Sequence, residues 1–463
     1  MDWCVSTDRN HEKCSHGGAE RLNKRILIIG GTGEMGQWFA RFFKRHGYQV
    51  TLWGRSRRVD IADKIGVNFA IDLDIAIQEN DIVIVSVPID ITEKVISETA
   101  PKMKPGSLLM DFTSIKSKPV EAMKKYAPEN VEILGTHPMF GPSIPSLYGQ
   151  IVIMTPIPDR CDNWFPIMKS LFEDNGAHIE IINPREHDRF VSVVQGLTHF
   201  AYITIGSTFK RLDFDVSESR RFMSPVYDIM IDFVGRIIGQ NPYLYALIQM
   251  ENPEVLKVHE AFKKECNNIS ETVRQHDVES FVENMKSSAS HFGDTTSALH
   301  RSDKIINSKL QEFDQIAGFI GKECGLEHRY SGTIHVGTIE KVKPRNVILS
   351  KSYQKKTVSL KIENIRLLSE SELREWKIRN LKHITRDISV FIPVNAVPET
   401  IMKVISSNDK IVNTEIIDTF SGFKNTEKLS VTYRMTILGD ADPNSVQKDI
   451  TRLLEGLGCE PRS

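Results

Sequence analysis

Short apolar runs separated by amphipathic stretches mark the first third of the chain. They predict buried strands near residues 25–30, 49–53, 81–88, 108–111 and 150–154. After the first run, apolar residues recur at helical spacing from Met35 to Phe43. Near-continuous apolar strands are typical of parallel sheets covered on both faces. We therefore predict an α/β Rossmann-like domain over residues 24–155.

The pattern changes after residue 155. Between residues 166 and 299, apolar positions recur three and four residues apart, which predicts an all-α domain over residues 156–310. Short β-branched runs at 331–339 and 356–362 then predict a small β-rich unit within a linker, residues 311–380.

The last segment, residues 381–463, predicts alternating strands and helices. Their expected order is a strand at 387–392, a helix at 398–407, strands at 411–420 and 429–438, and a helix at 443–457. This order is that of a ferredoxin-like α+β domain, which a last short strand could close.

Composition narrows the class of protein. The chain has 463 residues and a formal net charge of −1, so no global charge draws it to nucleic acid or membrane. No apolar run approaches the roughly 20 residues of a membrane helix. The 6 cysteines form no disulfide framework, which favours a cytoplasmic protein. Residues 1–23 hold Cys4, His11, Cys14 and His16, which match no zinc template, so we expect a disordered extension and no metal site.

A glycine-rich turn follows the first predicted strand. Its residues are Gly31, Thr32, Gly33, Glu34, Met35 and Gly36. Between a strand and a helix, such glycines permit a tight turn, close approach of backbone N–H groups to a pyrophosphate, and close helix packing. The turn predicts a dinucleotide site, and Val87 and Pro88, at the end of a later strand, are expected at its edge.

The end of the second strand indicates which dinucleotide binds. NAD enzymes place a carboxylate there for the ribose 2′-hydroxyl, whereas this chain has Arg55, Ser56 and Arg57. Guanidinium groups pair with a 2′-phosphate. We expect NADP as the cofactor, with NAD as the alternative.

Three histidines are candidates for chemistry. His137 lies in the stretch 135–141, which Pro138 and two glycines mark as a sharp loop. A histidine near a nicotinamide suggests dehydrogenase chemistry, because its pKa suits proton transfer near neutral pH. His187 and His199 are twelve residues apart, so on one continuous helix they would face a common cleft.

Together these motifs resemble the prephenate dehydrogenase family. The resemblance covers residues 24–300 and rests on the glycine turn, Asp111 to Lys116, residues 137–141, 186–188, the segment ending in His199, and residues 234–236. It implies an NAD(P)-binding domain, a helical dimerisation domain and a homodimer. The implied reaction, part of tyrosine biosynthesis, oxidises and decarboxylates prephenate to 4-hydroxyphenylpyruvate.

The resemblance also implies roles for single residues. His137 would be the base, Ser114 would join its hydrogen-bond network, and Arg236 would bind a substrate carboxylate. His187 and His199 would bind substrate or position the domains. Without the resemblance, Ser114 is a helix cap, Lys116 is a solvated residue of a first helical turn, and Arg236 forms an internal salt bridge to Asp228 or Asp232.

The C-terminal segment resembles the anticodon-binding domain of phenylalanyl-tRNA synthetase over about 80 residues, carried by residues 386–393, 415–422 and 431–436. Residues 341–390 hold 13 lysines and arginines against 5 acidic residues, but residues 391–463 hold 8 against 10. RNA binding, sensing of tyrosine or phenylalanine, and assembly all stay open. The acidic balance favours regulation or assembly over RNA, since phosphate contacts dominate nucleic-acid affinity.

We therefore expect a prephenate dehydrogenase. Arogenate dehydrogenase, whose substrate carries an amino group in place of the keto group, is the close alternative. From a different class, a dinucleotide-responsive regulatory protein could bind RNA or a partner through its last domain. The presence of a base at position 137 disfavours that alternative.

Overall fold

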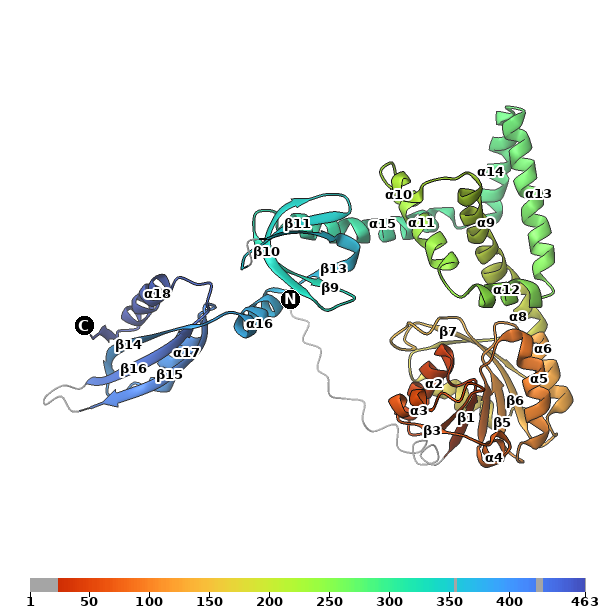
Figure 1. The fold of residues 1–463 in the computed structure, drawn as a ribbon, viewed down its shortest axis with the longest axis horizontal. Coiled ribbons are helices and arrows are strands. Elements are labelled where there is room, and N and C mark those ends of the chain that lie inside the picture. The colour runs from red at the N-terminus through yellow and green to blue at the C-terminus, as the bar shows by residue number, and fades with distance from the viewer. Residues whose placement is uncertain (1–23, 354–355, 422–427, 463) are drawn as a thin grey trace. The chain divides into compact units, whose positions relative to one another are not determined.

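The computed structural model describes residues 24–353, 356–421 and 428–462. The predicted N-terminal extension, with Cys4, His11, Cys14 and His16, lies outside the described residues. The chain divides into two compact units, residues 1–293 and 294–463 (Figure 1). No helix among the described residues is long and apolar enough to cross a membrane.

An eight-stranded sheet forms the first part of unit one. Its order is β3-β2-β1-β4-β5-β6-β7-β8, parallel except for the β6–β7 pair. The strands are β1 (Arg25–Ile29), β2 (Gln49–Trp53), β3 (Asn68–Phe69), β4 (Ile82–Val85), β5 (Leu108–Asp111), β6 (Glu132–Pro138), β7 (Ile151–Pro156) and β8 (His178–Ile181). The sheet thus continues past the predicted domain end at residue 155, because β8 adds to β7 beyond it.

Helices cover both faces of this sheet. They are α2 (Glu34–Arg45), α3 (Val59–Ile65), α4 (Leu73–Glu79), α5 (Ile89–Thr99), the 3₁₀ turn η1 (Ala100–Lys102), α6 (Ser117–Tyr126) and α7 (Trp164–Glu173). Alternate residues of β1 enter different cores: Ile26 and Ile28 pack with α2, and Leu27 and Ile29 with α4 and α6. The predicted Rossmann-like fold is confirmed.

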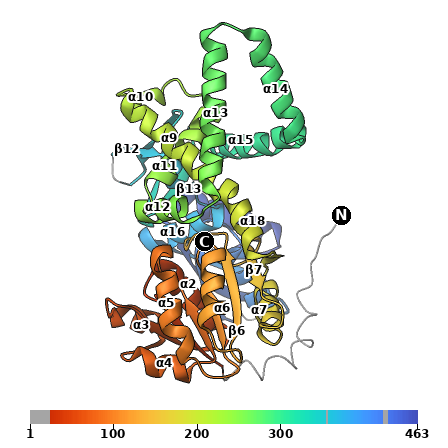
Figure 2. The ribbon, with the colours of Figure 1, turned by 90° about the vertical axis from the view of Figure 1, so that its right-hand side faces the viewer.

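The rest of unit one is helical, as predicted. Its elements are α8 (Pro184–Val191), the π-helix η2 (Ser192–Leu197), α9 (Thr198–Arg211), α10 (Val216–Ser219), α11 (Pro225–Ile238), α12 (Pro242–Glu251), α13 (Val255–Arg274) and α14 (Val278–Phe292). Figure 2 shows α13 and α14 as a long hairpin. The π-helix interrupts the single continuous helix expected between His187 and His199.

Unit two begins with α15 (Thr295–Ala317), which runs through the predicted boundary at residue 310. A five-stranded antiparallel sheet of order β12-β11-β10-β9-β13 follows. Its elements are β9 (Glu323–His328), β10 (Ile334–Val342), β11 (Asn346–Lys351), β12 (Thr357–Lys361), the 3₁₀ turn η3 (Ile362–Asn364) and β13 (Ile365–Leu367).

An α+β domain ends the chain. After α16 (Glu370–Asn380) come β14 (Ile384–Pro393), α17 (Pro398–Ser406), β15 (Ile411–Phe420), β16 (Lys428–Ile437), α18 (Pro443–Gly456) and β17 (Glu460–Pro461). The antiparallel sheet has the order β15-β16-β14-β17. Lys377 of α16 joins this domain to the preceding sheet, because it pairs with both Asp440 and Glu323.

Candidate active site

The glycine turn between β1 and α2 leaves no room for a side chain at Gly31 or Gly36. A methyl group on Gly31 would lie 2.7 Å from Leu52 Cδ2, and one on Gly36 would lie 2.6 Å from Gly31 Cα. Gly33 is the N-cap of α2 and has no side chain that could accept hydrogen bonds from the first turn. Backbone N–H groups at the positive end of α2 therefore stay available to an anion, which fits a dinucleotide pyrophosphate.

The predicted cofactor residues lie at the carboxyl edge of the sheet. Arg55, Ser56 and Arg57 come one residue after β2 and are exposed, and Val87 and Pro88 come one residue after β4. The chain crosses to opposite sides of β1 to reach β2 and β4, and ligands of such sheets bind at this switch point.

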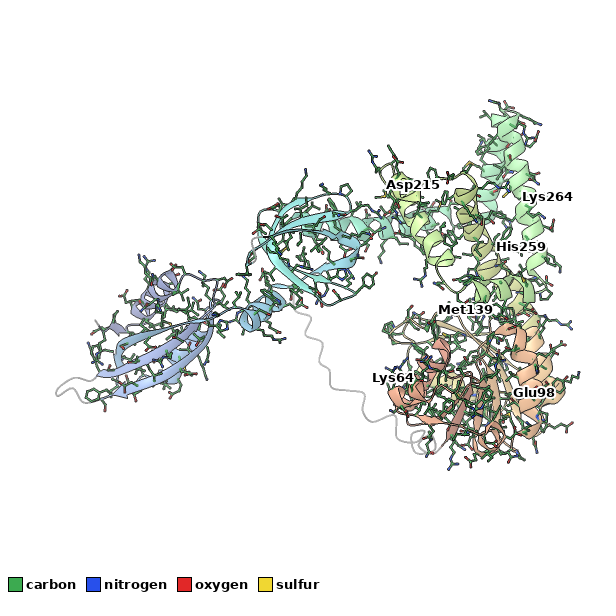
Figure 3. The ribbon with its side chains drawn as sticks, viewed as in Figure 1. Lys64, Glu98, Met139, Asp215, His259 and Lys264 are labelled. Carbon is green, nitrogen blue, oxygen red and sulfur yellow. The ribbon has the colours of Figure 1, made fainter. Side chains whose placement is uncertain are left out.

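His137 belongs to a strand, and the prediction of a sharp loop at residues 135–141 is wrong for its first half. β6 continues to Pro138 because β7 pairs with it in antiparallel register, with His137 opposite Ile153. The backbone of β6 forms its hydrogen bonds with β7, a strand further along the chain that local turn signals do not reveal. Figure 3 labels Met139, directly after β6, on the side of the sheet toward the helices.

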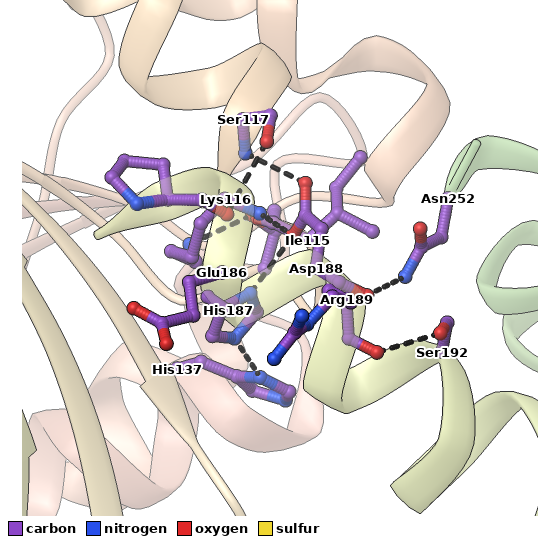
Figure 4. Close-up of polar contacts among 12 residues, drawn as sticks. Ile115, Lys116, Ser117, His137, Glu186, His187, Asp188, Arg189, Ser192 and Asn252 are labelled. Atoms are coloured by element: carbon purple, nitrogen blue, oxygen red, sulfur yellow. Dashed lines mark hydrogen bonds and ion pairs between the residues drawn. The ribbon is translucent and has the colours of Figure 1, made fainter. Parts of the chain in front are cut away.

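A hydrogen-bonded chain runs inward from His137, whose side chain is buried (Figure 4). His137 Nδ1 lies 2.9 Å from His187 Nε2, and His187 Nδ1 lies 2.8 Å from Asp188 Oδ1. The Asp188 carboxylate also accepts the backbone N–H groups of Lys116 and Ser117, at 2.7 and 2.9 Å. The loop after β5 and the middle of α8 thus hold one another and the histidine pair in place.

A fully buried ion pair lies beside this chain. Lys116 has an exposed fraction of 0%, and its Nζ pairs with the Asp111 carboxylate. Asp111 also accepts from Thr113 and from the backbone of Thr136. The expectation of a solvated Lys116 is wrong, because its side chain is fully buried beside Gly135. A methyl group on Gly135 would lie 3.2 Å from Lys116 Cδ, so the bare glycine leaves space for the lysine.

Burial determines how these groups titrate. Desolvation, together with the nearby His187 and Lys116, holds the pKa of His137 well below its usual value. Desolvation also lowers the pKa of His187, although the hydrogen bond to Asp188 opposes this. Burial alone would raise the pKa of Asp188, but the hydrogen bonds from His187 and Ser117 lower it. Both imidazoles are therefore neutral and Asp188 is charged at neutral pH.

The π-helix brings a further side chain to the site. Gln195 Nε2 lies 3.3 Å from His137 Nε2, and Gln195 Oε1 is buried without a hydrogen-bond partner among the described residues. A π-turn of this kind often marks a functional site. The sequence alone did not predict Gln195, Asp188, Asp111 or Lys116 as site residues. Asp111 and Lys116 could have been found, because they are charged residues at either end of a short loop after an apolar strand.

The remaining predicted residues are Ser114, His199 and Arg236. Ser114 is half-buried in the loop after β5 and, in the described chain, makes no hydrogen bond to His137. The ring of His199 packs edge to face on Tyr245, with centroids 4.6 Å apart. Arg236 of α11 is exposed, and its charge acts on Tyr245, where it opposes the rise that burial causes in the pKa of the phenol.

The alternative of an internal salt bridge to Arg236 is wrong within the described residues. Arg220 takes both expected carboxylates, at 3.1 Å from Asp228 and 3.0 Å from Asp232. Arg236 forms no ion pair in the part of the chain that the structure describes. Its charge is therefore available to an acidic ligand.

Comparisons with known proteins agree with this architecture. Residues 39–181 match the prephenate dehydrogenase nucleotide-binding domain, and residues 183–287 match the prephenate dehydrogenase dimerization domain. The T-protein of Haemophilus influenzae is 28% identical over 63% of this chain and 73% of its own. A crystal structure of prephenate dehydrogenase from A. aeolicus, with hydroxyphenyl propionate and NAD+, is 23% identical over 57% of this chain and 96% of its own, with a TM-score of 0.48.

One relative matches nearly the full length. The probable arogenate/prephenate dehydrogenase of Methanocaldococcus jannaschii is 38% identical over 448 residues, which are 96% of this chain and 99% of that protein. The predicted family is confirmed. With two matching domains and a relative aligned from end to end, this chain belongs to the prephenate and arogenate dehydrogenase family of nicotinamide-dependent oxidoreductases.

Proposed function

We propose that this chain oxidises and decarboxylates prephenate to 4-hydroxyphenylpyruvate, with NADP as its preferred cofactor. The observation that carries the proposal is the buried, neutral His137 beside the nucleotide-binding edge of the sheet. A neutral imidazole can take a proton at physiological pH, and this reaction requires one to be taken.

The substrate's chemistry explains the need for a base. A nicotinamide held at the glycine turn would supply the acceptor for a hydride from the ring carbon that carries the hydroxyl. His137 takes the hydroxyl proton as the carbonyl forms, and loss of the ring carboxylate as CO₂ then makes the ring aromatic. The Nε2 atom is the one that receives the proton, because His187 engages Nδ1.

Binding of the dianionic substrate needs positive or donating groups. We assign a substrate carboxylate to Arg236, because a guanidinium without an ion pair offers a planar pair of donors. His199, which shares Tyr245 with it, would bind substrate nearby. Ser114 stays a predicted member of the catalytic network, on the strength of its position between Asp111 and Lys116.

The NADP preference rests on the residues after β2. Arg55 and Arg57 are exposed and form no ion pair within the described chain, whereas the next residue, Arg58, pairs with Asp60 at 2.9 Å. Two free guanidinium groups would bind a 2′-phosphate, and a carboxylate that would repel it is absent from residues 54–58.

Steady-state rates with each combination of substrate and cofactor test the proposal. The absorbance of the reduced nicotinamide is followed with prephenate or arogenate, and with NADP or NAD. We expect the highest kcat/KM for prephenate with NADP. A higher kcat/KM for arogenate would change the substrate, equal values for both cofactors would remove the NADP preference, and no turnover with either substrate would reject the function.

For the whole molecule we infer a cytoplasmic homodimer formed through the helical domain, which is supported by the match to a dimerization domain. The C-terminal domain, with its βαββαβ order, is proposed to be ferredoxin-like and to serve regulation or assembly. Titration of tyrosine, phenylalanine and tRNA against the full chain distinguishes an effector site from an RNA site.

A further inference from the structure

The carboxylate of Asp188 fixes the protons of two rings in turn. An ionised carboxylate can only accept hydrogen bonds, so His187 must carry its proton on Nδ1, where it faces Asp188 Oδ1. A neutral His187 then has a bare Nε2, which can only accept. Across the 2.9 Å contact, His137 must therefore be the donor, through Nδ1–H.

The same constraint applies to Nε2 of His137, the atom that would meet the substrate. A neutral His137 with its proton on Nδ1 has a lone pair on Nε2. Gln195 is oriented accordingly, because its amide nitrogen, a donor, is the atom that faces this lone pair. Gln195, His137 and His187 thus form one chain of donors that all point toward Asp188. Figure 4 shows the part of this chain from His137 to Asp188.

We propose that the His187–Asp188 pair is a positioning device that sets the tautomer of His137 and stabilises the cation formed when His137 takes the substrate's proton. This inference rests on the proposed role of His137 as the base. The proton moves from the substrate hydroxyl to His137 Nε2, the Nδ1 proton stays in its bond to His187, and the hydroxyl oxygen keeps the electron pair that becomes part of the new carbonyl.

Asp188 is the carboxylate in direct contact with the histidine pair, and its negative charge attracts a cation there. It accepts from His187 and from the backbone amides of Lys116 and Ser117. The charge of Lys116, which pairs with Asp111, opposes a cation on either ring. On its other side, His187 borders an open pocket of about 240 Å³ that is lined mostly by apolar residues.

A direct measurement of the tautomer tests the inference without any loss of function. Solid-state ¹⁵N spectra of the histidine-labelled full chain separate protonated from bare ring nitrogens, and the spectrum of the His137→Asn variant identifies the His137 signals. We expect Nδ1 protonated and Nε2 bare at pH 7.5. A proton on Nε2, or an even mixture of tautomers, would overturn the proposal.

Two substitutions of His187 then connect the tautomer to turnover. His187→Leu removes the acceptor of the Nδ1 proton, and we expect kcat to fall by about 10²-fold or more with little change in KM for the cofactor. His187→Gln restores a carbonyl acceptor, so part of the lost kcat should return. The matched control is His178→Gln, which changes an exposed histidine bonded to Glu180 and should keep wild-type rates.

The proposed role of His137 as the base and the positioning role of His187 can be rejected separately. If His137→Asn keeps full turnover, the proposed base is wrong, whatever the spectra show. If His137→Asn is inactive but His187→Leu turns over like the wild type with an unchanged pH profile of kcat/KM, the base stands and the positioning role of His187 is rejected. A His187→Leu chain that does not fold leaves the spectra of the wild-type protein to decide.

Discussion

His137 is the residue on which the proposed reaction depends most. His137→Asn keeps a side chain of similar size but cannot accept a proton near neutral pH. We expect kcat to fall by about 10²- to 10⁴-fold, the usual contribution of general base catalysis, with KM little changed. Initial rates from nicotinamide absorbance measure both constants, and full activity of the variant would contradict the mechanism.

Lys116 contributes to stability through its buried ion pair with Asp111. Lys116→Met leaves Asp111 as a buried carboxylate without a cation, which typically costs about 3–5 kcal/mol of unfolding free energy. Urea unfolding measures the loss. The double variant Asp111→Leu with Lys116→Met removes both charges and should regain part of it. If the double variant is as unstable as the sum of the two single variants, the pair is not coupled.

The buried histidines make stability depend on pH. Desolvation lowers the pKa of His137 and His187 in the folded state, and that of His199 to about 4. Below the unfolded value of about 6.5, the unfolded chain binds more protons than the folded one, so stability falls as pH falls. We expect Tm to drop between pH 7 and pH 5, and to drop less in His199→Phe. Equal drops would show that His199 does not contribute.

Among the elements, the π-helix depends on a single glycine. A methyl group on Gly196 would lie 2.8 Å from Val255 Cγ2, at the start of α13. Gly196→Ala should therefore cost about 1–3 kcal/mol, as overpacking does, and should lower kcat because Gln195 shifts against His137. Gly235→Ala in α11 is the control, since nothing lies within 4 Å of its new methyl group. Wild-type rates and stability in Gly196→Ala would show that the π-helix can accommodate the methyl group without moving Gln195.

The elements that sequence predicts well are those whose pattern is local. The strand, glycine turn and helix from Arg25 to Arg45 follow from adjacent residues, and so does the order of elements from β14 to α18. The strand that carries His137 could not be found this way, because its hydrogen-bond partner β7 lies more than ten residues further along.

Burial of the site residues was equally hidden from sequence. The position of Lys116 depends on Asp111, on the bare backbone of Gly135 and on a helix some seventy residues later, whose Asp188 accepts its N–H group. A helical spacing rule also fails where the helix changes type, so His187 and His199 face different partners. Local patterns therefore supplied the list of candidate residues, and tertiary contacts decided which of them meet.

At the scale of the whole molecule, the named residues of the candidate site all belong to one unit. The glycine turn, the histidine pair and both family matches lie within residues 24–293, and the chain divides after Gly293. The sheets of unit two have buried clusters of their own, around Leu326 and Tyr433. Units with separate cores can usually fold alone.

We therefore expect a fragment of residues 24–293 to keep the kcat and KM of the full chain, and residues 294–463 to fold without it. Circular dichroism and urea unfolding measure folding, and nicotinamide absorbance measures turnover. A fragment that ends at residue 250 should be inactive, because it lacks Asn252, which donates to the Asp188 carbonyl at 2.8 Å, and Val255, which packs on Gly196. If the 24–293 fragment folds yet turns over more slowly, unit two contributes to catalysis. The next experiment would then test feedback regulation through the C-terminal domain.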